Sequence, residues 1–181
     1  MKKACILLAS PRKQGNTAAL TAPFAAELEK LGWSCRTVWL YDLEVRPCRA
    51  CRVCQQDWTV FGCPQNDDMQ EIFDSVLACD LLVLATPIYS WYCTPPMKAV
   101  LDRLVYGMNK YYGREKGPSL WEGKPVALMN KDDKVRAIRF LNESGAFLVT
   151  KSGDKIAKYF GISKYTLYSY IDTKQQEGKH D

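Results

Sequence analysis

The stretch that decides the fold reads ACILLA at positions 4–9 and SPRKQGNT at positions 10–17. An uninterrupted apolar run followed by turn residues is typical of a buried strand in a parallel sheet. The next segment, 18–31, has apolar residues at helical spacing, and Gly32 directly after it is a common residue at the end of a helix. The beginning of the chain therefore predicts a strand, a loop and a helix in succession.

The alternation of strands and helices continues to about residue 130. Apolar patterns predict further strands at 34–40, 80–85 and 124–129, and helices at 68–79 and from about Met97. Such βαβ units predict an α/β domain with a parallel sheet. Because ligands bind outside the carboxyl ends of parallel strands, the loops after the first and third strands are the expected binding loops.

The composition limits where the protein is expected to act. The chain has 181 residues, of which 47% are hydrophobic and 25% charged, as is usual for soluble globular proteins. Its apolar runs are far shorter than the ~20 residues of a membrane span. Ser10 and Pro11 interrupt the run behind the N-terminal lysines, which argues against a signal peptide. We therefore expect a cytoplasmic protein without membrane contact.

The loop after the first strand has the properties of a phosphate-binding loop. Backbone N–H groups and the positive end of the helix dipole point toward a ligand at such a position. The loop also offers short donors, a glycine that permits close approach, and two cations, namely Ser10, Asn16, Thr17, Gly15, Arg12 and Lys13. No Gly-Lys-Ser/Thr follows, so it is not a Walker A loop. The alternative is an ordinary turn before a capped helix.

The loop after the third strand, residues 86–98, places three aromatic side chains beside the same expected crevice. A flat ring stacks well on tyrosine or tryptophan, and the prolines of the loop hold its backbone rigid. A hydrophobic lid or an oligomer contact would use the same residue types. This loop alone leaves the three alternatives open.

Taken together, the two loops resemble a known family. The run 8–17, the Thr86–Tyr89 segment, and Lys98 with Asp102-Arg103 are similar to the phosphate loop, the isoalloxazine loop and the following helix of flavodoxin-like NAD(P)H-dependent FMN reductases. The resemblance covers about residues 2–130. It implies a flavodoxin-like doubly wound parallel sheet that binds FMN. This sheet is shortened here, because the family normally continues after the fourth strand into another helix and strand.

The resemblance also assigns residues to the cofactor. It implies that the phosphate is held by Ser10, Arg12, Asn16 and Thr17, and that the ring is contacted by Pro87, Ile88, Tyr89 and Ser90. Such proteins pass hydride from NAD(P)H to the flavin and then electrons to an acceptor, and the cofactor supplies the chemistry. We therefore assign no catalytic acid or base. The only histidine, His180, lies in the polar tail.

Four of the eight cysteines form a second candidate centre, with the spacing C-x2-C-x2-C-x8-C: Cys48, Cys51, Cys54 and Cys63. Three thiolates at this spacing can face one point and a fourth can arrive from a loop, as an iron–sulfur cluster requires. The segment resembles the compact cysteine motif of iron–sulfur flavoproteins, which implies a [4Fe–4S] cluster. Zinc uses similar spacings. Free or redox-active thiols are the third interpretation, and all three stay open.

Residues 153–170 have the spacing of a helix-turn-helix. Ala157 permits two helices to cross closely, and Gly161 supplies the turn. The expected inner face consists of Ile156, Phe160, Ile162, Leu167 and Tyr170. The second helix would present to the major groove of DNA the residues Ser163, Lys164, Tyr165, Thr166 and Ser169. The alternative is a helical hairpin that packs on the first domain.

Charge and a second resemblance favour DNA binding. Between positions 134 and 164, seven basic residues face two acidic ones, and this local excess equals the net charge of +5 of the whole chain. A basic patch suits phosphate contacts. Residues 135–172 also resemble the C-terminal DNA-binding domain of YheO-type transcriptional regulators, through the turn at 145–149 and the GIS…TLY signature that begins at Gly161.

The sequence thus predicts an FMN-binding domain at 1–131 and a helix-turn-helix module with a polar tail at 132–181. The leading hypothesis is an oxidoreductase that passes hydride from NAD(P)H through flavin to an unidentified acceptor, fused to a DNA-binding module. The alternative is a redox-sensing transcriptional regulator whose flavin or cysteine centre is a sensor without significant turnover. A domain that has lost its cofactor and serves dimerisation is the third. The first two favour a homodimer, because operators mirror two-fold symmetry.

Overall fold

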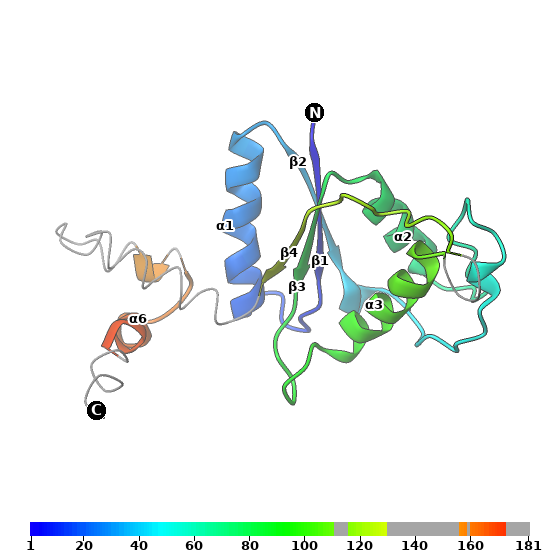
Figure 1. The fold of residues 1–181 in the computed structure, drawn as a ribbon. Helices are drawn as coiled ribbons and strands as arrows, with labels where there is room; N and C mark the ends of the chain where they lie inside the picture. Colours follow the sequence, from blue (N-terminus) through cyan, green and yellow to red (C-terminus); the bar gives the residue numbers. More distant parts are fainter. Residues whose placement is uncertain (111–115, 130–155, 159, 173–181) are drawn as a thin grey trace, which may run out of the picture.

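The computed structural model describes residues 1–110, 116–129, 156–158 and 160–172. A parallel sheet is formed by β1 (Lys3–Leu8), β2 (Ser34–Trp39), β3 (Leu81–Ala85) and β4 (Val126–Met129), in the order β2-β1-β3-β4. The connections hold the helices α1 (Asn16–Lys30), α2 (Met69–Ala78) and α3 (Pro95–Met108), and the short 3-10 helices η1 (Leu40–Asp42) and η2 (Val53–Gln55). The last helix is α6 (Lys164–Asp172) (Figure 1).

The predicted α/β class and the order of strands and helices are confirmed up to residue 129. The third helix begins earlier than expected, at Pro95 rather than near Met97. Proline fits the first turn of a helix because the N–H there has no partner within the helix and the ring presets φ. The helical pattern at 134–142 and the turn at 145–149 lie outside the described residues.

The helices cover the sheet on both faces, with α1 on one side and α2 and α3 on the other (Figure 1). The central strands β1 and β3 are almost entirely buried because each has neighbours on both edges and on both faces. On the α1 side, Ile6, Leu8 and Val83 are at most 1% exposed. The larger cluster on the other side joins residues of β1, β3, α2 and α3, including Leu7, Leu82, Ile72, Val100 and Leu104.

A close contact between α3 and the segment before α2 organises the larger cluster. Phe61 is 2% exposed and stacks on Phe73 of α2, with their ring centroids 4.6 Å apart. The ring of Phe61 lies so near Gly107 of α3 that a Cβ at this glycine would be 2.1 Å from a ring carbon. Only glycine permits this approach. The absence of a side chain at Gly107 therefore lets Phe61, and with it the cysteine-bearing segment 48–63, pack against α3.

We expect the substitution Gly107→Ala to lower the free energy of unfolding by about 1–3 kcal/mol, because the added methyl overpacks the Phe61 ring. Urea denaturation measures this change. Val105→Ala, on the same helix but 47% exposed, is the matched control and should stay within about 0.5 kcal/mol of the parent. Equal stability of the Gly107→Ala variant and the parent would contradict the contact.

Candidate functional site

The first candidate site lies where β1 and β3 end side by side. The backbone N–H of Ala9 donates to the Ala85 carbonyl at 2.8 Å, and the Thr94 hydroxyl donates to the Ala9 carbonyl at 3.0 Å. The chain leaves β1 toward α1 on one face and leaves β3 toward α3 on the other, so the two loops diverge here (Figure 1). Such a switch point in a doubly wound sheet leaves a crevice for a ligand.

The loop after β1 has the features expected of an anion-binding loop. Ser10 is 4% exposed, and its hydroxyl oxygen accepts a hydrogen bond from the Arg12 N–H at 3.3 Å. Gly15 donates to the Arg12 carbonyl at 3.1 Å, and a Cβ at Gly15 would lie 3.0 Å from the Arg12 Cβ. Helix α1 starts with no side-chain cap and no acidic residue in its first turn. Its positive end is therefore suited to a bound anion.

The structure distinguishes the two cations of this loop. The ammonium of Lys13 forms an ion pair with Asp42 and lies 4.2 Å from the ring centroid of Trp39, so it is directed toward the end of β2. Arg12 is exposed and forms no ion pair with any described residue. The residues alone left open which cation serves the loop, whereas the family resemblance assigned Arg12. This arrangement favours Arg12.

The loop after β3 folds into a tight hairpin. Tyr89 and Tyr92 exchange backbone hydrogen bonds of 2.7 and 2.9 Å, and the residues between them, Ser90 and Trp91, have φ angles of 48° and 66°. Two non-glycine residues in this left-handed region carry backbone strain, a feature that gathers at ligand sites. The loop ends are joined because Thr94 N–H donates to the Thr86 hydroxyl at 3.1 Å.

The side chains assigned to the flavin ring are open to a ligand. Pro87 is half-buried, and Ile88, Tyr89 and Ser90 are exposed beside the switch point. Tyr41 was missed by the sequence analysis. It follows β2, and partial burial and its neighbour Tyr89 raise the pKa of its hydroxyl, against an opposing hydrogen bond with Thr94. Its position at a strand end was the signal that could have found it.

The four candidate cysteines line one small pocket, together with Arg103 and Tyr106 of α3. Ala50 and Arg52, between the cysteines, have φ angles of 52° and 63°, and this curls the chain around the pocket. Burial raises the pKa of the Cys54 thiol, and the other three cysteines add to this. All four are free thiols, and no three metal-binding side chains of the described residues stand in metal-binding geometry.

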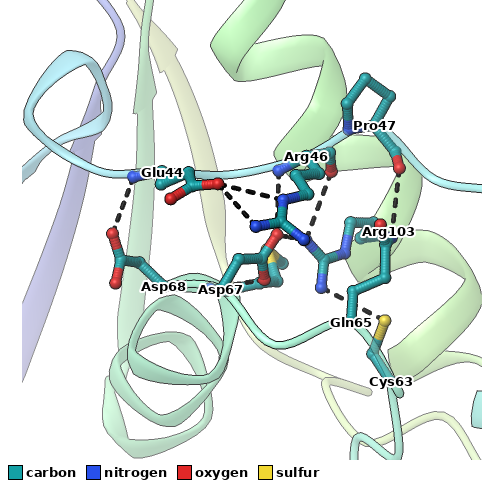
Figure 2. A network of polar contacts seen from close by, with 9 residues as sticks. Glu44, Arg46, Pro47, Cys63, Gln65, Asp67, Asp68 and Arg103 are labelled. Atoms are coloured by element: carbon teal, nitrogen blue, oxygen red, sulfur yellow. Dashed lines mark hydrogen bonds and ion pairs between the residues drawn. The ribbon is translucent and has the colours of Figure 1, made fainter.

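Hydrogen bonds between residues 44–47 and residues 65–68 join the two ends of the cysteine-bearing segment 48–63 (Figure 2). We call this junction the neck of the segment. Asp68 accepts the N–H of Glu44 at 2.7 Å and returns a backbone bond of 3.0 Å. Asp67 accepts the N–H of Arg46 at 2.9 Å, and the Gln65 amide donates to the Pro47 carbonyl at 3.1 Å. The paired aspartates after the cysteines thus close the loop that carries them.

Arg103 and Asp67 form a buried ion pair inside this neck, with side chains that are 1% and 0% exposed and an N–O distance of 2.5 Å. The guanidinium also donates to the Arg46 carbonyl at 3.3 Å and to the Cys63 sulfur at 3.2 Å (Figure 2). Burial acts to raise the pKa of Asp67, but hydrogen bonds from Arg103, Arg46 and Met69 outweigh it and leave the pKa below its usual value.

A second buried cation supports the same segment. Lys110 follows α3 and is 0% exposed, and its ammonium donates to the carbonyls of Cys54, Val60 and Phe61 at 2.5, 2.6 and 3.2 Å. Burial lowers the pKa of this ammonium. Nothing in the sequence marked Lys110 as buried, because a lysine in a polar, glycine-rich stretch is usually a surface residue.

The C-terminal residues confirm the predicted turn. Phe160, Ala157 and Leu167 are buried at 5%, 4% and 0% exposure, and the residues packed on them are Ile156, Ile162 and Tyr170. Gly161 has a φ of 59°, as the turn requires, and the Ser163 hydroxyl accepts the Thr166 N–H at 3.0 Å to cap α6. The outer side of α6 carries Lys164, Tyr165 and Ser169 exposed, with Tyr165 at 85%.

Comparison with known proteins identifies the family. The model of the NADPH-dependent FMN reductase family matches residues 2–135, and that of a helix-turn-helix domain matches residues 119–172. The chain belongs to the NADPH-dependent FMN reductase family. The resemblance to FMN reductases and the predicted helix-turn-helix are thereby confirmed, whereas the YheO-type likeness and a domain boundary near residue 131 stay predictions.

Individual relatives add detail. The chain is 34% identical over 104 residues to an iron–sulfur flavoprotein of Methanosarcina thermophila, which covers 57% of this chain and 52% of the relative. It is 34% identical over 106 residues to an iron–sulfur flavoprotein of Archaeoglobus fulgidus, which covers 58% of this chain and 47% of the relative. The chain therefore spans about half the length of the curated relatives that it matches.

Solved structures confirm the fold. An NAD(P)H:quinone oxidoreductase of Methanothermobacter marburgensis superimposes with a TM-score of 0.59 at 16% identity, over 99% of this chain and 98% of the other. RosB, solved with a bound flavin phosphate intermediate, superimposes with a TM-score of 0.56 at 19% identity, over 99% of this chain and 82% of the other.

Among the described helices, none is long and apolar enough to cross a membrane.

We expect Asp67→Asn to lower the free energy of unfolding by about 3–5 kcal/mol, because it leaves the Arg103 charge buried without its partner. Since the pKa of Asp67 is lowered in the folded state, its contribution is complete above the usual value of about 3.9 and is lost as the pH falls through the lower folded pKa. The stability difference between parent and variant should therefore shrink below pH ~4.

Denaturation at several pH values measures this difference. Glu71→Gln is the control, because it removes one partner of the exposed Arg36–Glu71 pair and should cost at most about 1 kcal/mol. A loss at Asp67 no larger than at Glu71 would show that the buried pair is not a main source of stability.

Proposed function

We propose that this chain binds FMN at the switch point between β1 and β3 and passes hydride from NAD(P)H through the flavin to an acceptor. The observation that carries the proposal is that the two loops lie side by side. The loop after β1 leads to the uncapped N-terminus of α1, the loop after β3 contains the strained aromatic hairpin, and the hydrogen bond from Thr94 to Ala9 joins them. The family match supports it, and so does the flavin phosphate held by RosB, which shares the fold.

The residues of the crevice fit FMN. Ser10, Arg12, Asn16 and Thr17 would hold the phosphate, where a Cβ at Gly15 would make a tight contact of 3.0 Å with Arg12. Pro87, Ile88, Tyr89 and Ser90 would flank the ring and exclude water from one side of it. The bound flavin would supply the hydride chemistry. The role of the protein is then to bind and orient the two ligands, which requires no acid or base.

The two loop cations provide a sharp test of the phosphate site. Arg12→Ala should weaken FMN binding by about 1.5–3 kcal/mol, roughly 10- to 150-fold, because a charge-assisted hydrogen bond to the phosphate is lost. Lys13→Ala is the matched control and should change binding less than about threefold, because Lys13 is directed toward Asp42 and Trp39. Quenching of FMN fluorescence measures both.

Two results would contradict the flavin proposal. Equal losses in the two variants would mean that the phosphate is not held by this loop as described. A parent protein that stays colourless after incubation with FMN would exclude the cofactor altogether and favour a dimerisation module without cofactor.

We propose further that Cys48, Cys51, Cys54 and Cys63 hold a [4Fe–4S] cluster. The shared pocket, the curled backbone at Ala50 and Arg52, and two buried cations beside it suit a negatively charged thiolate site. The curated relatives are named as iron–sulfur flavoproteins. Iron and sulfide analysis with the absorbance near 400 nm after anaerobic purification tests this. Zinc without iron would support a zinc site, and the absence of both metals would support free or redox-active thiols.

The C-terminal module is proposed to bind DNA through Ser163, Lys164, Tyr165, Thr166 and Ser169. Its support is the helix-turn-helix match and the packing of Ala157, Phe160 and Leu167, which leaves Ser163, Lys164, Tyr165 and Ser169 exposed. Lys158 and Lys164 are the described members of the basic patch, and both are exposed.

We expect binding to a mixed-sequence DNA duplex to weaken steeply with salt, since phosphate contacts release counterions. Lys164→Ala should weaken binding several-fold and reduce the salt slope by about one, whereas Lys30→Ala, an exposed lysine of α1, should change neither. Fluorescence anisotropy at several salt concentrations gives both quantities. Absence of binding, or binding that is independent of salt, would contradict the DNA-binding role.

The redox-sensing regulator remains the second candidate function, because the helix-turn-helix match adds a DNA-binding module to a flavin reductase domain. The rate of NAD(P)H oxidation with a quinone or flavin acceptor separates the two. Turnover of about 1 per second or more is typical of enzymes and supports the oxidoreductase. Turnover far below this, with DNA affinity that changes on reduction, supports the regulator. Both proposals expect a homodimer, which light scattering measures directly.

A further inference from the structure

Arg103 is directed into the wall of the four-cysteine pocket although its side chain is only 1% exposed. One end of the guanidinium contacts Asp67 and the Arg46 carbonyl, and the other donates to the Cys63 sulfur (Figure 2). Among the described residues, nothing accepts a hydrogen bond from its Nε. A buried guanidinium with an unused donor is costly unless a further negative group lies beside it.

The charges around the pocket explain what that group could be. Four thiolates with a bound iron–sulfur or zinc group carry net negative charge, and buried negative charge needs compensation. Arg103 and Lys110 are the buried cations beside these cysteines in the described part of the chain. Lys110 is fully engaged with three carbonyls, whereas Arg103 reaches a sulfur atom itself.

We propose that Arg103 is a positioning residue of the four-cysteine site, which fixes Cys63 and raises the reduction potential of the redox group held there. The inference rests on the proposed iron–sulfur centre. When such a centre gains one electron, its negative charge increases, and a nearby guanidinium stabilises the reduced form. Asp67 anchors the guanidinium and partly offsets its charge. Arg103 therefore raises the reduction potential of the centre, and Asp67 lowers it.

The two residues are therefore expected to shift the reduction potential in opposite directions when each is replaced. Arg103→Gln removes positive charge and the N–H···S bond, so the potential should fall. Asp67→Asn removes the offsetting negative charge while Arg103 stays, so the potential should rise. Arg103→Lys keeps the charge on a single ammonium that cannot contact Asp67 and Cys63 in the same geometry, and its potential should lie between the parent and Arg103→Gln. Arg36→Gln, in an exposed ion pair with Glu71, should leave the potential unchanged.

Anaerobic spectroelectrochemical titration of the purified full chains measures each potential, and iron content per chain confirms loading. Shifts of opposite sign for Arg103→Gln and Asp67→Asn support the inference. Shifts of the same sign, or shifts equal to that of Arg36→Gln, overturn it, because damage to the fold has no reason to change sign. If Arg103→Gln fails to fold, Arg103→Lys and Asp67→Asn carry the same comparison.

The iron and sulfide content of the parent protein tests the proposed cluster separately from the role of Arg103. A parent without iron and sulfide shows that the cluster proposal is wrong, and the inference on its potential is wrong with it. A parent that holds the cluster but whose potential does not respond to either residue keeps the cluster and rejects the role of Arg103.

Discussion

The ion pair between Arg103 and Asp67 is the constraint on which the cysteine half of the molecule depends. It joins α3 to both ends of a segment that has little regular structure of its own, since η2 is its only described helix. Because both side chains are buried, neither can lose its partner cheaply. The pair therefore holds four thiols in one pocket without any strand or long helix in the segment that bears them.

The crevice at the other end of α3 depends on backbone geometry instead. Gly15 permits the loop after β1 to close on Arg12, and the left-handed pair Ser90 and Trp91 forces the hairpin after β3. Thr94 joins the two loops through Ala9 and directly precedes α3. The same helix thus begins at the proposed flavin site and reaches the cysteine pocket through Arg103, so both sites are built on one rigid element.

Sequence reasoning was strongest where the pattern is local. The buried strands at Ile6 and Val83, the turn at Gly161 and the loops of the proposed flavin site follow from periodicity and turn chemistry, and the structure confirms their placement. The partners of Arg103 and Lys110 could not be predicted, because their contacts join residues 36 to 57 positions apart. Charged side chains in a sequence suggest a surface, and only the fold shows which of them are buried.

The open N-terminus of α1 has a thermodynamic consequence. Because that helix end has no side-chain cap, a ligand that satisfies it binds the folded chain and not the unfolded one, and so adds RT ln(1 + [L]/Kd) to the folding free energy. The abundance of the folded protein in a cell would then follow the supply of its ligand. Under the proposed function, loss of flavin would remove the hydride chemistry and at the same time lower the folding free energy, which would expose more of the chain to proteases.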